Sequence, residues 1–152
     1  MNESSASKFV YVTFIRTTPE RLWSALTTAE FTKQYWFGMH CESDWKAGSS
    51  WQLKFPDGRV ADAGEILEAE RPKRLVIKWR NEFRPELTAE GYSRCTMDLE
   101  PSGEAVKLTI RHEMERPGAK FIEAVSGGWP LILSNLKSLL ETGEVAMKER
   151  SR

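Results

Sequence analysis

The sequence predicts a single α+β domain in which one long C-terminal helix lies across a curved antiparallel sheet. Two observations carry this prediction. Between Lys120 and Gly143, apolar residues recur at three- and four-residue spacing, which is typical of one face of a helix. Between Trp51 and His112, apolar residues instead alternate with polar ones, which indicates strands with one face in a core. The helical face carries Ile122, Val125, Trp129, Ile132, Leu133, Leu136, Leu139 and Leu140.

Length and composition are those of one ordinary domain without net charge. The chain has 152 residues, and its 22 Lys and Arg are balanced by 22 Asp and Glu. The two kinds of charge are interspersed along the sequence rather than grouped in blocks. A nucleic-acid partner is excluded, because it would require a basic stripe. Residues 1–7 lack the apolar segment of a signal peptide, and no run approaches the roughly 20 apolar residues of a membrane span. We therefore expect a cytoplasmic protein with a domain at 8–143 and flexible tails at 1–7 and 144–152.

The N-terminal part of the chain predicts one strand followed by two short helices. Phe9–Ile15 is rich in β-branched and aromatic residues, and both of its alternating faces are apolar. Such a strand is either covered on both sides or part of an oligomer contact. Thr18 is a suitable N-cap and Pro19 a suitable first helical residue, so a helix begins there. A second short helix begins near Ala29.

Alternating segments after Trp45 predict about six further strands between the two short helices and the long helix. Turns are predicted at Pro56–Gly58, Arg71–Lys73 and Glu100–Gly103. The polar segment Asn81–Gly91 predicts a loop or a loosely ordered hairpin end. The charged stretch Arg80–Glu90 either covers a cavity or is solvated, and we favour the solvated segment. The alternating segments are Trp51–Phe55, Val60–Ala69, Leu75–Trp79, Cys95–Leu99 and Val106–His112.

The C-terminal helix contains one internal proline. Pro130 has no N–H to donate and its ring crowds the preceding turn, so a kink or a restart is expected there. Gly143 predicts the end of the helix, because glycine readily adopts the left-handed conformation of a helix terminator.

This order of elements, with several short motifs, resembles the helix-grip fold of the SRPBCC superfamily. The motifs include Ile15–Trp23, Gly64–Glu68 and Gly128–Trp129, and the resemblance covers 9–143. The chain is most similar to the group named for the C-terminal domain of the activator of the heat-shock chaperone (Hsp90) ATPase. The resemblance implies a seven-stranded curved antiparallel sheet around the long C-terminal helix, with two short helices after the first strand. It also implies a hydrophobic cavity, in which members bind lipids, sterols, polyketides or other apolar molecules.

The candidate binding residues are apolar and aromatic side chains at strand and helix ends, where such a cavity opens. His112 shares a strand face with Leu108 and Ile110, so it is expected to point inward near Trp129. No catalytic residue is assigned, and His112 is the side chain that acid–base chemistry would use. The alternative is a half-exposed histidine bonded to the backbone. The candidates are Trp36, Trp51, Leu53, Ile77, Trp79, Met97, Ile110, His112, Trp129, Leu133 and Leu136.

Metal and cofactor sites are not predicted. His40, Cys41 and Glu42 lie together on an expected loop, but a zinc site needs two well-spaced ligand pairs. Cys41 and Cys95 are expected to be reduced thiols, and Cys95 to be a small core residue. The chain has no nucleophile elbow, phosphate-binding glycine loop or dinucleotide motif. We therefore predict no metal and no cofactor.

Three functions remain open at this point. The first is the binding of an apolar or amphipathic small molecule, oriented by His112 and by Tyr11 or Arg111. The second is a cyclase- or hydrolase-like enzyme, which requires His112 to pair with a carboxylate or an arginine inside the pocket. The third is an interaction module that contacts a chaperone or a second copy, with a filled core and exposed apolar residues at Val10, Val12 and Phe14. A chaperone partner is the less favoured, and monomer and homodimer stay open.

Overall fold

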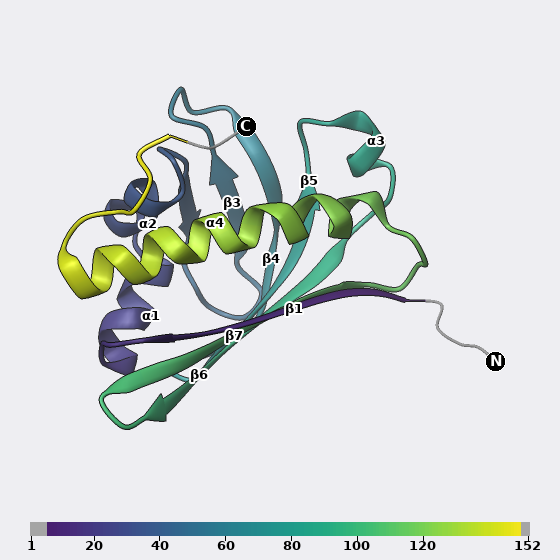
Figure 1. Ribbon diagram of the computed structural model, residues 1–152. Helices are drawn as coiled ribbons and strands as arrows, with labels where there is room; N and C mark the ends of the chain where they lie inside the picture. The colour runs from purple at the N-terminus through teal and green to yellow at the C-terminus, as the bar shows by residue number, and fades with distance from the viewer. Residues whose placement is uncertain (1–5, 150–152) are drawn as a thin grey trace.

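The computed structural model describes residues 6–149 and has the predicted α+β helix-grip architecture (Figure 1). Its seven strands form one antiparallel sheet in the order β1-β7-β6-β5-β4-β3-β2. The long helix α4 (Lys120–Thr142) crosses one face of this sheet, and α1 (Pro19–Thr27) and α2 (Ala29–Tyr35) lie near its C-terminal end. Residues 1–5 and 150–152 of the predicted tails lie outside the described residues.

The strands follow the alternating segments of the sequence, with one addition. β2 was not predicted as a strand, because it is short and only Cys41 among its residues is buried. β5 continues two residues beyond Trp79, so that Asn81 still belongs to the sheet. The strands are β1 (Ser7–Ile15), β2 (His40–Ser43), β3 (Ser50–Lys54), β4 (Val60–Glu70), β5 (Arg74–Asn81), β6 (Ser93–Ser102) and β7 (Ala105–Met114).

Two expected turns and loops differ from the structure. The turn expected at Glu100–Gly103 is tighter, because β6 runs to Ser102 and Pro101 still faces Val106 of β7. The expected loop after β5 contains a short helix, α3 (Pro85–Thr88). Its apolar residue Leu87 is buried against the core, so the segment is folded onto the domain rather than solvated.

Helix α4 is continuous through Pro130, so the expected restart is wrong. The proline costs the helix about 3 kcal/mol or more. On either side of it, Trp129, Ile132 and Leu133 are each almost fully buried, and burial of each such side chain stabilises the fold by about 1.5–3 kcal/mol. Tertiary packing therefore outweighs the local cost. The helix ends as predicted, with Gly143 at a φ of 90° and its N–H bonded to the Leu139 carbonyl.

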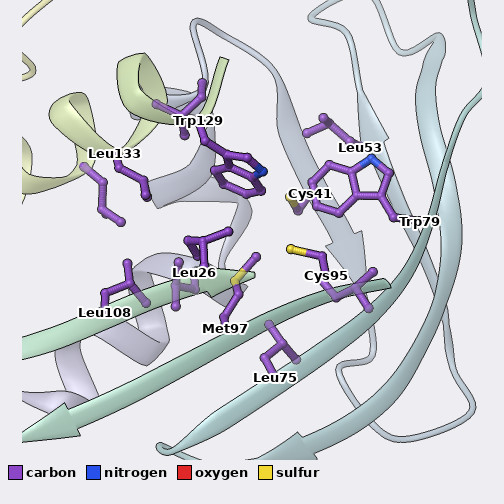
Figure 2. Packing of buried hydrophobic residues seen from close by; sticks show 14 of the residues in the cluster. Leu26, Cys41, Leu53, Leu75, Trp79, Cys95, Met97, Leu108, Trp129 and Leu133 are labelled. Atoms are coloured by element: carbon purple, nitrogen blue, oxygen red, sulfur yellow. The ribbon is translucent and has the colours of Figure 1, made fainter. Parts of the chain in front are cut away.

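Gly64 lets two tryptophans pack side by side on the sheet. It lies in β4 directly between Trp51 of β3 and Trp79 of β5. A Cβ at this position would lie 1.6 Å from the backbone oxygen of Lys78, so only glycine fits. The rings of Trp51 and Trp79 then approach to 4.3 Å between centroids. Figure 2 shows the core in which Trp79 and Trp129 meet side chains from the neighbouring strands.

The two faces of β1 differ in exposure. Phe9 and Tyr11 point inward and pack against the core. On the outer face, Val10 and Val12 are each 44% exposed and Phe14 is 49% exposed. Within the described residues, no element covers this apolar stripe.

Candidate functional site

A pocket of about 280 Å³ opens between the sheet, α3 and the N-terminal half of α4. This volume is at the lower end of the range for small-molecule sites, about 300–1,000 Å³. Most of its walls are aromatic or aliphatic, and its polar side chains are Asp62, Asn81 and Arg84. The apolar walls are Trp36, Phe37, Met39, Leu53, Phe55, Trp79, Phe83, Leu87, Phe121, Ala124, Val125, Trp129 and Ile132.

Trp79 is the centre of the aromatic wall. Its ring centroid lies 6.2 Å from that of Trp36 and 5.8 Å from that of Trp129, and all three rings line the pocket. Trp36 and Trp129 meet edge to face, with centroids 5.5 Å apart. Such aromatic pairs contribute about 0.5–1.5 kcal/mol beyond the area that they bury. The three rings therefore form one continuous aromatic wall, in which their planes are tilted against one another by 38° to 69°.

Asp62 is a buried carboxyl group at the edge of this wall. Its side chain is 6% exposed, and Oδ2 accepts a hydrogen bond of 2.7 Å from Trp79 Nε1. Burial raises the pKa of Asp62 to about 7, the nearby charge of Glu82 also raises it, and the Trp79 bond opposes the rise. Near neutral pH the pocket therefore contains a carboxyl group that exists in both protonation states.

Asn81 lies directly opposite Asp62 on the neighbouring strand β5 and is also 6% exposed. Its side-chain oxygen accepts from the backbone N–H groups of Phe83, at 3.2 Å, and Arg84, at 2.9 Å. Because two N–H donors need an acceptor, these bonds fix which end of the amide is oxygen. Asn81 thus holds the segment that leads into α3, and its amide nitrogen is left for the pocket.

His112 is fully buried and points inward, rather than lying half-exposed at a strand end. Its Nδ1 accepts from Trp129 Nε1 at 3.1 Å, and Nε2 lies 2.8 Å from Ser93 Oγ. The Ser93 hydroxyl donates to the Trp79 carbonyl at 2.9 Å, so its oxygen is free to accept from His112 Nε2. Burial lowers the pKa of His112 to about 3, which keeps the ring neutral.

The pairing that an enzyme would need at His112 is not found. Among residues 6–149, its ring nitrogens bond Trp129 and Ser93, and neither a carboxylate nor an arginine reaches them. His112 also does not line the pocket. The side chain therefore acts as a neutral bridge that holds Trp129 of α4 against β6 and β7.

The predicted binding residues divide into three groups. Trp36, Leu53, Trp79 and Trp129 line the main pocket. Ile110, His112 and Leu136 line none of the pockets found among residues 6–149 and belong to the buried core. The remaining residues surround a second void of about 20 Å³, which is too small for an organic ligand; they are Trp51, Ile77, Met97 and Leu133.

Several pocket residues were missed in the sequence. Asp62 and Asn81 follow the period-two alternation of their strands, and extending the inward face of Leu75, Ile77 and Trp79 by one more step would have reached Asn81. Phe83, Arg84 and Leu87 lie in a charged segment that was expected to be solvated rather than to cover a cavity, whereas in the structure all three line the pocket.

Thiol and metal chemistry find no support in the described part of the chain. Cys41 and Cys95 are buried and free, burial raises the pKa of Cys41 to about 12, and it raises that of Cys95 as well. His40 Nε2 lies 2.9 Å from Glu42 Oε2, but no group of three metal-binding side chains occurs over 6–149. No described helix has the length and apolar character of a membrane span.

The fold and the pocket together define the class of protein. A seven-stranded antiparallel sheet around a long C-terminal helix, with an aromatic pocket between them, is the helix-grip arrangement of SRPBCC proteins. The model of the family described as "Activator of Hsp90 ATPase homolog 1-like protein" matches residues 16–141, and the chain belongs to this family. No curated protein sequence matches the chain significantly.

Solved structures share the fold at low sequence identity. Protein MLL2253 from Mesorhizobium loti has a TM-score of 0.77 at 23% identity, covering 91% of this chain and 100% of that one. PFC0360w, an HSP90 activator from Plasmodium falciparum, has a TM-score of 0.72 at 24% identity, covering 88% and 95%. The Aha1 dimer from Colwellia psychrerythraea has a TM-score of 0.73 at 18% identity, covering 90% and 98%.

Proposed function

We propose that this chain binds a small apolar or amphipathic molecule in the pocket between the sheet and α4. The observation that carries the proposal is the combination of an open aromatic pocket with two buried polar groups at its edge, Asp62 and Asn81. Ligand sites have this composition, in which apolar walls supply affinity and a few polar groups set orientation. Apolar area removed from water contributes about 25 cal/mol per Å² to such binding.

Binding is favoured over catalysis because the pocket lacks an acid–base pair. Of the residues that line it, only Asp62 and Arg84 carry titratable groups. The Arg84 guanidinium bonds Glu86 at 2.8 Å, and the Asp62 carboxyl bonds Trp79. The expected roles of His112, Tyr11 and Arg111 in orienting a ligand pass to Asp62 and Asn81 in this proposal, because those three do not line the pocket.

Native mass spectrometry of the freshly purified chain, with solvent extraction of anything that co-purifies, tests the proposal. Val125 on α4 lines the pocket, and a Val125→Trp variant fills it. Ser134 lies on the same helix with an exposed side chain, so Ser134→Trp is the matched control. We expect an apolar adduct on the wild type and on the control, but not on Val125→Trp.

Adducts of equal occupancy on all three proteins would contradict the proposal, because filling the pocket would then have no effect. If no adduct co-purifies, the same three proteins are titrated with naphthalene by calorimetry. Failure of the wild type to bind naphthalene and its hydroxyl and methoxy derivatives, or equal binding by Val125→Trp, would also contradict it.

A second candidate function is a contact with a protein partner through the outer face of β1. The exposed stripe of Val10, Val12 and Phe14 favours it, and the similar structures include an HSP90 activator and an Aha1 dimer. The open pocket does not favour a protein contact, because an interaction module was expected to have a filled core. Light scattering of the wild type and of a Val12→Lys variant tests self-association: a wild-type monomer at all concentrations would exclude the homodimer.

A further inference from the structure

Asp62 and Asn81 form a matched polar pair at one side of the pocket. They are direct partners in the β4–β5 ladder, so their side chains project from the same face of the sheet. Both line the pocket, and each side chain is only 6% exposed. Neither unused atom of this pair is among the fully buried, unpaired side-chain atoms of the described residues, so both are reached from the pocket and indicate what it accepts.

Each member of the pair uses one polar atom within the protein and leaves the other unused. Asp62 Oδ2 accepts from Trp79, whereas Oδ1 bonds no described residue. The Asn81 oxygen accepts from Phe83 and Arg84, whereas Nδ2 bonds none of residues 6–149. The pocket thus presents one unused carboxyl oxygen beside one unused N–H donor.

The next inference rests on the proposed function. We propose that the ligand is a neutral ring compound with a hydroxyl group, and that this hydroxyl donates to Asp62 Oδ1 and accepts from Asn81 Nδ2. A hydroxyl is the smallest group that both donates and accepts. The rings of Trp36, Trp79 and Trp129 form the wall against which the ring body packs.

Charged ligand groups satisfy this pair less well. An ammonium group has donors only, so it would face the Asn81 N–H donor without accepting from it. A carboxylate has acceptors only and would be repelled by an ionised Asp62. A hydroxyl fits both protonation states of Asp62, because it donates to the carboxylate and accepts from the carboxylic acid. This matters because the pKa of Asp62 lies near 7.

A series of naphthalene derivatives tests the hydroxyl on the wild-type protein by calorimetry at pH 7. Naphthalene lacks a polar group, 2-methoxynaphthalene only accepts, and 2-naphthol accepts and donates. We expect 2-naphthol to bind about tenfold more tightly than naphthalene, from two hydrogen bonds of modest net strength. The methyl ether is expected to show less than half of that gain on a logarithmic scale, because it cannot donate to Asp62.

Variants test which residues read the hydroxyl. Asp62→Asn keeps an oxygen for Trp79 but replaces the unused acceptor with a donor, so the affinity ratio of 2-naphthol to naphthalene should fall toward one. The double variant Asp62→Asn with Asn81→Asp exchanges donor and acceptor, and the ratio should recover. Asp98→Asn is the control, since Asp98 bonds Arg74 and lines no described pocket.

The outcomes separate this inference from the proposed function. If naphthalene and 2-naphthol bind equally, the pocket binds ligands but the hydroxyl inference is wrong. Tighter binding of 2-naphthoate or 2-naphthylmethylamine than of 2-naphthol would overturn it as well, as would an unchanged ratio in Asp62→Asn. If no member of the series binds, the proposed function itself fails.

Discussion

Trp79 and Asp62 are joined by a hydrogen bond of 2.7 Å from the indole nitrogen to the carboxyl oxygen. The bond connects the aromatic wall of the pocket to its polar edge, because Trp79 packs against Trp36 and Trp129 while Asp62 lies opposite Asn81. It also fixes which oxygen of Asp62 is left unused. The pocket is therefore built around Asp62 of β4 and Trp79 of β5, and the contribution of Asp62 to the stability of the protein can be measured.

Replacing Asp62 by Asn is expected to stabilise the protein at alkaline pH. Burial raises the pKa of Asp62 from 3.8 to about 7, so between these values the folded state retains a proton that the unfolded chain has lost. The free energy of unfolding therefore falls as pH rises across this window. Asn removes the effect and keeps an acceptor for Trp79. Urea unfolding should show a gain that grows from near zero at pH 4 to about 2–4 kcal/mol at pH 8. A gain that does not change with pH would contradict a raised pKa.

His112 is expected to act with the opposite sign. Burial lowers its pKa from 6.5 to about 3, so below pH 6.5 the unfolded chain binds a proton that the folded state refuses. This contribution to the free energy of unfolding is lost as pH falls toward 3. His112→Gln keeps a neutral donor and acceptor for Ser93 and Trp129, but destabilises at pH 7 through poorer packing. Its deficit against the wild type should shrink by about 2–3 kcal/mol between pH 7 and pH 4.5.

A deficit that is equal at both pH values would show that His112 titrates normally in the folded state. In the wild type, the slopes from His112 and Asp62 oppose each other between about pH 4 and pH 6.5. For the two single variants, the differences in free energy of unfolding from the wild type are therefore expected to change with pH in opposite directions. Exposed carboxylates cannot produce this result, because all three proteins share them.

Two glycine-to-alanine changes are expected to have opposite effects. At Gly64 a Cβ would lie 1.6 Å from the Lys78 carbonyl, so β4 must separate from β5 and the change should cost more than about 2 kcal/mol. At Gly127, which is exposed on α4, a Cβ meets nothing within 4 Å. Alanine there should stabilise the helix by about 0.5–1 kcal/mol. Thermal unfolding of both variants checks the pair, and a tolerated Gly64→Ala would show that β4 and β5 are less closely apposed.

The order of elements was predictable from the sequence because its signals are local and repeated, whereas the seven-stranded sheet around the helix was implied by the family resemblance. The Thr18 cap is confirmed by its bond to the Arg21 N–H, and the Gly143 terminator by its left-handed φ. The short strand β2 could not be predicted, since its four residues have no alternating apolar pattern. The helix passes Pro130 because tertiary packing overrides a local preference, which no local pattern reports.

The site was less predictable than the fold. Apolar alternation marks inward residues but does not separate a pocket wall from filled core, so Trp79 and Ile110 look alike in the sequence although only Trp79 lines the pocket. Asp62 and Asn81 meet only through the register of β4 and β5. The location in the cytoplasm and the binding of an apolar ligand stay predictions, and monomer and homodimer both stay open.

The most direct test of the pocket is a nitrogen-15 NMR titration with 2-naphthol that follows the indole N–H signals. Trp36, Trp79 and Trp129 line the pocket, whereas Trp23 of α1 is buried away from it. We expect the first three indole signals to shift with one common dissociation constant while the Trp23 signal stays in place. Saturable shifts confined to residues outside the pocket, or no shift at any indole, would contradict the account.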